Sequence, residues 1–279
     1  MPQFPAISDL IQLTLDAGRE VMAVHDAGFE AIKKEDGSPV TIADQRAEAV
    51  IEAGLQRLAP GVPMLGEEST SEGRIPELGD LFWCVDPIDG TKDFIEGGTG
   101  EFTVNIALVE NGVPIIGIVL APATGALYAG SEAGAFYAQA DARSAKLISE
   151  LKPIRTQSAS VWRIIGSRRH GKGGGMDKFC EAIGAHERIA ASSSIKFCKL
   201  AEGAADLYPR FGPVSEWDAA AGHAVLIAAG GGVMLTDGGP MMYGNVKSKF
   251  LIDGFVAYSR SEAREAALAA LAQMKANKR

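Results

Sequence analysis

Two aspartates three residues apart, Asp86 and Asp89, offer the first clear chemistry in this sequence. They follow an apolar run of strand length, residues 81–85, and they flank a proline that is expected to end that strand. Two carboxylates held close together repel each other unless a cation lies between them. Hard oxygen ligands of this kind suit Mg²⁺, Mn²⁺ or Ca²⁺. The alternative is a surface turn with a capping aspartate, since Asp, Pro and Gly are ordinary turn residues.

Three acidic residues elsewhere in the chain favour the metal site over the turn. Asp44 lies in the first turn of a predicted helix, Glu67 in a polar loop, and Asp218 at the start of an apolar helix. Each has a simpler explanation alone: Asp44 and Asp218 complement a helix dipole, and Glu67 is a solvated charge. Together they supply the carboxylates with which a phosphatase holds metal ions roughly 3.5–4 Å apart, around an attacking water and a leaving oxygen.

Composition limits the classes of protein that need to be considered. Hydrophobic residues make up 47% of the 279 residues, enough for a sizeable globular core. The net charge of −8, without a long basic run, argues against nucleic acid as a partner. Three cysteines without metal-binding spacing predict reduced core thiols in a cytosolic protein. The N-terminus does not resemble a signal peptide, and no apolar run has the length of a transmembrane segment.

The first half of the chain predicts two helices followed by a sheet. Apolar residues recur at helical spacing over residues 7–24 and 41–58. Runs of strand length joined by glycine-containing turns then predict a mostly antiparallel sheet packed on these helices. The predicted strands are residues 81–85, 102–110, 113–120, 126–130 and 134–138.

The second half predicts alternating strands and helices, which is typical of an α/β unit. Strands are expected at residues 161–165, 188–191, 205–208, 233–235 and 255–257. Helices are expected at residues 176–183, 195–202 and 217–229, with a last helix capped by Ser261. The boundary is placed near residues 145–158. Residues 1–150 would then form a metal-binding α+β half, and residues 151–279 an α/β half that completes the site with Asp218.

Four motifs in register resemble one family of phosphatases. They are Gly-Glu-Glu-Ser at residues 66–69, Asp-Pro-Ile-Asp-Gly-Thr at 86–91, Trp-Asp-Ala-Ala-Ala-Gly at 217–222, and the segment 36–44 that leads into the second helix. In order and spacing they resemble the lithium-sensitive, magnesium-dependent phosphatases of the inositol monophosphatase superfamily, over essentially the whole chain. The resemblance implies a layered αβαβα sandwich of the sugar-phosphatase type, with an antiparallel-rich N-terminal sheet and a smaller α/β C-terminal half.

The resemblance also implies a role for each acidic residue. One Mg²⁺ would be held by Glu67, Asp86 and the backbone carbonyl of Ile88, and a second by Asp86, Asp89 and Asp218. Asp44 would steer a third, weakly held ion. Glu67 and Thr91 would orient and deprotonate the attacking water. Substrate contacts would come from Glu67, Ile88, Asp89, Gly90, Thr91 and Asp218, with the Gly90 and Thr91 amides meeting phosphate oxygens.

Other stretches resemble the CysQ-type 3'(2'),5'-bisphosphate nucleotidase branch. They are Lys92-Asp93 after the Asp-Gly-Thr motif, residues 192–198 and residues 205–213. Residues 167–170 resemble that branch too, departing from it at Arg169. A second substrate phosphate needs its own cations, which Lys196, Arg210 and Arg168 could supply, while Ser193 and Ser194 offer hydroxyls. Each of these cations would otherwise be a solvated surface charge.

The sequence therefore predicts Mg²⁺-dependent hydrolysis of adenosine 3',5'-bisphosphate to AMP and phosphate, with two to three ions and a cytoplasmic location. The alternatives are an inositol 1-phosphate or related sugar monophosphatase, a fructose-1,6-bisphosphatase, and a non-catalytic metal- or phosphate-binding protein. Peripheral association with the inner membrane, and the choice between monomer and homodimer, stay open. Glu216 either tunes specificity or has no functional role, and residues 171–175 are expected to form a flexible loop.

Overall fold

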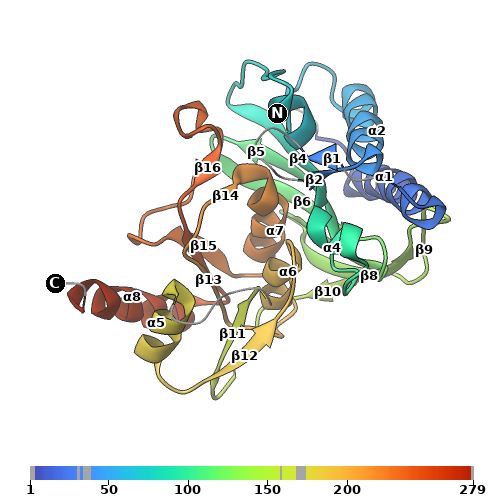
Figure 1. Ribbon diagram of the computed structural model, residues 1–279. Helices are drawn as coiled ribbons and strands as arrows, with labels where there is room; N and C mark the ends of the chain where they lie inside the picture. Colours follow the sequence, from blue (N-terminus) through green and yellow to red (C-terminus); the bar gives the residue numbers. More distant parts are fainter. Residues whose placement is uncertain (1–3, 30–31, 34–38, 158, 168–173, 278–279) are drawn as a thin grey trace.

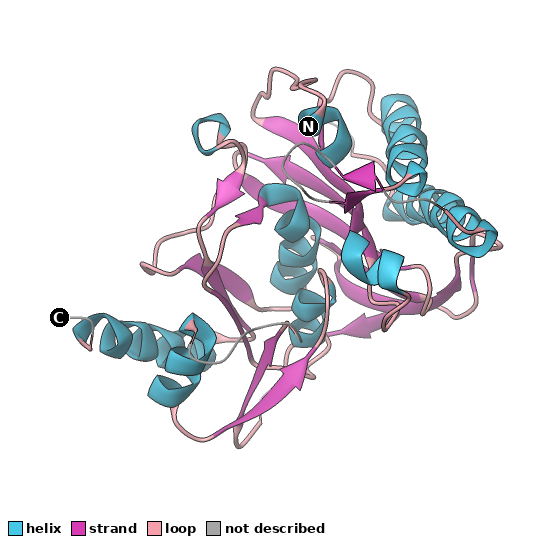
Figure 2. Cartoon of the chain, viewed as in Figure 1, coloured by secondary structure: helices cyan, strands magenta, loops and turns pink. Residues whose placement is uncertain are grey.

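The computed structural model describes residues 4–29, 32–33, 39–157, 159–167 and 174–277. Over these residues the chain forms five layers in the order helices, sheet, helices, sheet, helices (Figure 1). Three hydrophobic clusters fill the spaces between the layers (Figure 2). One lies between the first helices and the large sheet, one surrounds the central helices between the two sheets, and one lies between the smaller sheet and the outer helices.

The first helical layer consists of α1 (Ile7–Ala27) and α2 (Ile42–Leu58). Their buried residues recur at helical spacing and pack on one face of the large sheet. α2 begins with a capping box in which the Thr41 hydroxyl accepts from the Ala43 N–H and the Asp44 carboxylate accepts from the Thr41 N–H. The position of Asp44 is therefore fixed by the start of α2.

The large sheet carries most of the chain's first half. Its order is β10-β8-β7-β6-β5-β4-β3, with β9 paired to β8, and only the β3–β4 pair is parallel. The strands are β3 (Met64–Gly66), β4 (Leu81–Asp89), β5 (Thr103–Glu110), β6 (Val113–Ala121), β7 (Ala126–Ser131), β8 (Gly134–Asp141), β9 (Lys146–Leu147) and β10 (Lys152–Ile154).

The central helical layer, α6 (Ile195–Ala201) and α7 (Glu216–Ala228), lies between the two sheets. α7 is apolar around almost its whole circumference, as a helix buried on all sides requires. Glycines let it approach the large sheet closely. A Cβ at Gly117 would lie 2.3 Å from the Ala221 carbonyl oxygen, and one at Gly130 would lie 2.6 Å from the Val225 Cα.

The smaller sheet and the outermost helices complete the second half. The sheet order is β12-β11-β13-β17-β15, with β11 parallel to its neighbours and β17 antiparallel to both of its own. Its strands are β11 (Trp162–Gly166), β12 (His186–Ala190), β13 (Leu207–Arg210), β15 (Gly232–Leu235) and β17 (Phe255–Tyr258). The outer helices are α5 (Gly175–Ile183) and α8 (Ser261–Ala276), which pack on this sheet and on each other.

Short elements connect the layers. They are β1 (Ile32–Lys33), β2 (Pro39–Val40), α3 (Glu67–Ser71), α4 (Thr91–Glu96), β14 (Val214–Ser215), β16 (Leu251–Ile252) and the 3₁₀ helix η1 (Val246–Ser248). Within the described part of the chain, no helix is both long and apolar enough to cross a membrane.

The predicted fold class is confirmed, and three local expectations are wrong. β4 does not end before Pro87 but continues to Asp89. Glu67 begins helix α3 instead of lying in a loop. Arg260 occupies the N-cap of α8, so Ser261 is its first helical residue. The division near residue 150 stays a prediction.

The close approach of α7 to the large sheet predicts a steric limit at Gly130. Gly130→Ala should lower the free energy of unfolding by about 1–3 kcal/mol, because the added methyl group meets backbone atoms that cannot move aside alone. Gly79→Ala is the matched control, since a Cβ there has no neighbour within 4 Å. Urea denaturation measures both variants, and equal losses would contradict this account of Gly130.

Candidate active site

A bulge in β4 places Asp86 and Asp89 on the same side of the sheet. Asp86 pairs with Asn105 of β5 and Asp89 with Thr103, so three residue steps on β4 match two on β5. Side chains alternate between faces along a regular strand, so residues three apart would point in opposite directions. The extra residue restores a common direction. Pro87 falls inside this irregular stretch, where the missing N–H costs little.

Asp218 completes a cluster of three carboxylates from two different layers. It lies in the first turn of α7, and its Oδ2 accepts a hydrogen bond from the Ser215 N–H at 3.2 Å. One ligand oxygen from each of Asp86, Asp89 and Asp218 lies within 4.8 Å of the others. This separation allows one divalent cation to contact all three carboxylates.

The electrostatics of the cluster fit a bound cation. Burial raises the pKa of Asp86 well above its usual range, and neighbouring carboxylates, led by Glu67, raise it further. Burial likewise raises the pKa values of Asp89 and Asp218. The Asp86 Oδ2 atom is buried without a hydrogen-bond partner among the described residues, whereas Oδ1 accepts from the Ile88 N–H at 2.9 Å. A buried carboxylate oxygen without a donor is costly unless a cation contacts it.

Glu67 and Asp44 extend the acidic group beyond these three aspartates. Glu67 begins α3, and its charge raises the pKa values of Asp44, Asp86 and Asp218, which places it electrostatically among them. Burial raises the pKa of Asp44 to about 6. The Asp44 Oδ2 atom accepts from the Thr41 N–H at 2.7 Å and from the Thr41 hydroxyl at 2.8 Å. Asp44 therefore caps α2 and also faces Glu67.

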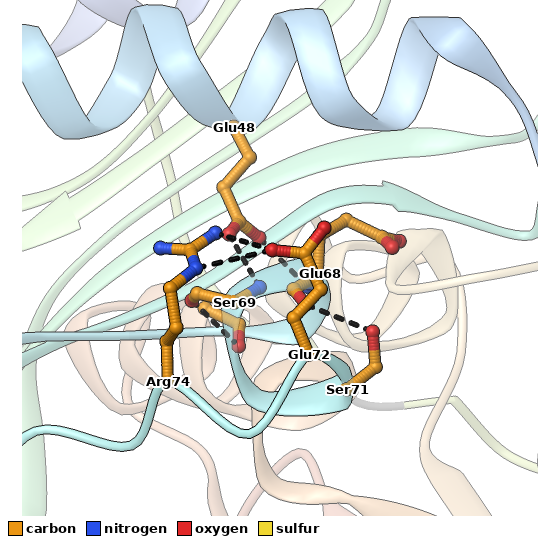
Figure 3. A network of polar contacts seen from close by, with 7 residues as sticks. Glu48, Glu68, Ser69, Ser71, Glu72 and Arg74 are labelled. Carbon is orange, nitrogen blue, oxygen red and sulfur yellow. Dashed lines mark hydrogen bonds and ion pairs between the residues drawn. The ribbon is translucent and has the colours of Figure 1, made fainter.

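Glu48, which no sequence motif singled out, holds the first turn of α3, which begins with Glu67. The Glu48 carboxylate accepts the N–H groups of Glu68 (2.8 Å) and Ser69 (2.7 Å), the second and third residues of α3 (Figure 3). Figure 3 shows this carboxylate reaching from α2 across to the first turn of α3. The sequence does contain a sign of this role for Glu48. The residue lies four positions after Asp44, on the buried side of an amphipathic helix where a glutamate needs a partner.

Two serines from the second half of the chain fix the ends of β4 and α7. The Ser193 hydroxyl donates to the Asp89 carbonyl at 2.9 Å, and the Ser194 hydroxyl donates to the Asp218 carbonyl at 2.7 Å. Gly90 has φ +91°, and a Cβ there would lie 2.3 Å from the Ser193 Oγ atom, so both conformation and space require glycine. These serines position the carboxylates, and their contact with substrate stays a prediction.

Lys196 and Arg210 lie beside the acidic cluster. Both charges lower the pKa of Asp89, against the larger effect of burial. The Lys196 ammonium donates to the Ser193 carbonyl at 2.6 Å and lies 5.3 Å from the centre of the Tyr208 ring. The Arg210 Nη2 atom donates to the Pro213 carbonyl at 2.8 Å. The predicted pair of cations is thus brought to the same place as the acids.

A cleft of about 530 Å³ opens next to these residues. Its volume lies in the range of typical small-molecule sites. Its described polar lining consists of Asp89, Gly90, Lys92, Asp93, Ser167, Ser192, Ser193, Lys196, Arg210 and Asp218. Phe197, Tyr208, Val214 and Phe255 provide an apolar floor. The site combines acids able to hold metal ions with bases and aromatic rings able to hold an organic phosphate.

The remaining predictions for single residues have mixed outcomes. Glu216 is buried and accepts the N–H groups of Gly244 (2.6 Å) and Asn245 (2.9 Å), so it fixes that loop. The three cysteines are free and buried, as expected. Arg168, Arg169 and His170, together with residues 171–173, lie outside the described residues.

The chain belongs to the inositol monophosphatase family, because the sequence model of that family matches residues 6–275. A relative from Shigella flexneri named 3'(2'),5'-bisphosphate nucleotidase CysQ is 40% identical over 251 residues, covering 89% of this chain and 98% of the relative. The relative of that name from Buchnera aphidicola is 36% identical over 254 residues, covering 90% and 92%.

Solved structures give the same assignment. The crystal structure of CysQ from Bacteroides thetaiotaomicron superimposes with a TM-score of 0.74 at 33% identity, over 91% of this chain and 96% of that one. An inositol monophosphatase from Anabaena superimposes with a TM-score of 0.72 at 25% identity, over 96% and 95%. Proteins of this family are metal-dependent phosphatases, which agrees with the acidic cluster.

The contact between Glu48 and α3 predicts that Glu48→Ala lowers stability by about 1–3 kcal/mol, because two buried N–H groups lose their acceptor. The variant should also respond less to Mg²⁺, since Glu67 is no longer held in place. Glu52→Ala, one turn later on α2 and exposed, is the control. Thermal unfolding with and without Mg²⁺ measures both effects. Equal behaviour of the two variants would remove Glu48 from the site.

The repulsion within the carboxylate cluster predicts opposite effects of Asp89→Asn on stability and on activity. In chelator the variant should unfold at a higher temperature than the wild type, because one buried charge is gone. Mg²⁺ should stabilise the wild type but have little effect on the variant, and turnover should fall at least about 100-fold. Asp253→Asn, at an exposed loop position, is the control. A variant with undiminished phosphate release would show that Asp89 is not a metal ligand.

Proposed function

We propose that this protein is a 3'(2'),5'-bisphosphate nucleotidase that hydrolyses the 3'-phosphate of adenosine 3',5'-bisphosphate, giving AMP and phosphate. The observation that carries the proposal is the cluster of Asp86, Asp89 and Asp218 at a cleft that Lys196 and Arg210 also line. The relatives named as bisphosphate nucleotidases, at up to 40% identity over most of the chain, support the same reading.

The metal in this proposal is Mg²⁺, with two to three ions. Glu67, Asp86 and the Ile88 carbonyl would hold one ion, and Asp86, Asp89 and Asp218 another. Asp44 would steer a third. The unpartnered Asp86 Oδ2 atom and the raised pKa values of the cluster fit such ligands. When bound, divalent cations neutralise charge on the phosphate and lower the pKa of a water molecule.

Thr91 and Glu67 are proposed to place the attacking water. The Thr91 hydroxyl donates its proton to the Ile88 carbonyl at 3.1 Å, so its oxygen has lone pairs left to accept a hydrogen bond from water. The Glu67 carboxylate, at the start of α3, would take up the proton that the water loses as it attacks phosphorus. The attack is in line with the leaving 3'-oxygen and forms no covalent phosphoenzyme.

The amides of Gly90 and Thr91 are proposed to hold phosphate oxygens where the chain leaves β4. Because Gly90 has no side chain and a positive φ, the backbone can come close to the phosphate there. The cleft places this turn beside Lys196 and Arg210, whose charges attract a ligand with more than one phosphate.

The organic part of the substrate would lie over an apolar base formed by aromatic side chains. Phe197, Tyr208 and Phe255 form a cluster with ring centres 5.1–5.4 Å apart, and all three line the cleft. These rings are 2%, 4% and 0% exposed, so they form a packed base beneath the cleft and do not offer free faces for stacking. The buried free cysteines agree with an enzyme of a reducing compartment such as the cytoplasm.

A panel of three substrates tests the proposal. With Mg²⁺, phosphate release from adenosine 3',5'-bisphosphate should exceed that from inositol 1-phosphate and fructose 1,6-bisphosphate by at least about tenfold in kcat/KM, because inositol 1-phosphate offers the cations no second phosphate and fructose 1,6-bisphosphate carries its second phosphate on a different scaffold. Chromatography should identify AMP as the product, and Li⁺ should inhibit the reaction, as the family resemblance implies. Faster turnover of inositol 1-phosphate would replace this function with that of a sugar monophosphatase.

A further inference from the structure

One basic residue of the cleft, Lys92, has no role in the site described so far. It is the second residue of α4, is exposed, and lines the cleft next to Asp89 and Gly90. Within the described part of the chain, no hydrogen bond or ion pair engages its ammonium group. The adjacent Asp93 does not neutralise it, since the Asp93 carboxylate accepts from the Thr99 hydroxyl (3.2 Å) and the Glu101 N–H (3.1 Å).

The other two cations of the cleft differ from Lys92 because the protein already uses them. Lys196 is 4% exposed, and its ammonium is bonded to the Ser193 carbonyl. Arg210 is bonded to the Pro213 carbonyl. Both charged groups are therefore already held by carbonyl groups of the protein. Of the described basic residues that line the cleft, Lys92 is the one whose charged group has no hydrogen-bond or ion-pair partner among the described residues.

The position of Lys92 suits a phosphate that is not the one being cleaved. It follows Asp89 by three residues, and it reaches the cleft from the N-terminal half, whereas Lys196 and Arg210 come from α6 and β13. A lysine at the start of a helix gains nothing from the helix dipole, so local structure does not explain its charge. An ammonium on a flexible stem attracts an exposed phosphate dianion without strict geometry.

We propose that Lys92 binds the non-reacting phosphate of the substrate and so determines the preference for nucleoside bisphosphates over nucleoside monophosphates. This inference rests on the proposed nucleotidase function and adds a specificity residue to it. On this proposal Lys196 and Arg210 contact the phosphate next to the acidic cluster, and Lys92 contacts the second phosphate.

Steady-state kinetics of Lys92→Met and Lys92→Arg on two substrates test this assignment. The substrates are adenosine 3',5'-bisphosphate and adenosine 3'-monophosphate, which differ only in the second phosphate. In Lys92→Met the ratio of their kcat/KM values should fall about tenfold, mainly through the KM for the bisphosphate, and Lys92→Arg should keep most of the preference. The bisphosphate reaction should also become less sensitive to salt in Lys92→Met. Lys146→Met removes one exposed lysine on β9, outside the cleft, and should leave the ratio unchanged.

An unchanged ratio in Lys92→Met, whether both activities are retained or both fall by the same factor, would overturn the inference while leaving the proposed function standing. The proposed function is tested separately, by the activity of the wild-type protein. If the wild type hydrolyses inositol 1-phosphate faster than the bisphosphate, both the proposed function and this inference are wrong. Because Lys92 is exposed, thermal unfolding of Lys92→Met should match that of the wild type, which separates a kinetic effect from misfolding.

Discussion

Repulsion among the carboxylates of Asp86, Asp89 and Asp218 is the constraint on which the rest of the site depends. Their oxygens lie within 4.8 Å of one another, with Asp86 buried and Asp89 and Asp218 half-buried. At an effective dielectric constant of about 20, two unit charges at that distance repel by about 3 kcal/mol. Without a cation such a cluster would move apart or take up protons. The protein must therefore hold it together with structure that is rigid for other reasons.

That rigidity comes from elements buried on both sides. β4 is paired with β3 as far as Val85 and with β5 as far as Asp89, and it lies between the α1–α2 layer and the α6–α7 layer, which restricts movement of the bulge that aligns Asp86 with Asp89. α7 is buried along its length, and Gly117 and Gly130 let it lie directly on the sheet. The two elements are tied together by the Ser193 and Ser194 hydroxyls, which bond to the carbonyls of Asp89 and Asp218 themselves. The site exists only where both halves of the chain meet.

Residue types and spacing predicted the acidic cluster, the helices and most strands, because those features depend on local periodicity and on short motifs. Asp44, at the capped start of α2, and the pair Asp86 and Asp89 are of this kind. The bulge was not predicted, since Pro87 indicates the end of a strand until the pairing with β5 is known. Pairing with β5 on either side of the bulge therefore overrides the local preference of one proline, whose missing N–H the bulge accommodates.

Contacts between distant residues escaped the sequence for a different reason. Glu48 bonds to N–H groups 20 and 21 residues away, and Ser193 bonds to a carbonyl 104 residues away. A buried glutamate and a serine have many possible partners, and only the packing of layers selects one. Glu216 is an example: from its place beside the Trp-Asp motif we expected either a tuning of specificity or no functional role, whereas its carboxylate fixes a loop at residues 244–245.

In this fold, the residues that support the acidic cluster differ from the residues that line the rest of the cleft. The carboxylates lie within 4.8 Å of one another, Ser193 and Ser194 bond to the carbonyls of Asp89 and Asp218, and Lys196 bonds to the Ser193 carbonyl. A substitution at any of these residues therefore alters the charge or the geometry of the cluster. Lys92 and the aromatic floor contact the cleft without supporting the cluster by any hydrogen bond that the described residues show. Selection among phosphate esters can therefore act on the cleft walls, while the acids that hold the metal ions remain the same.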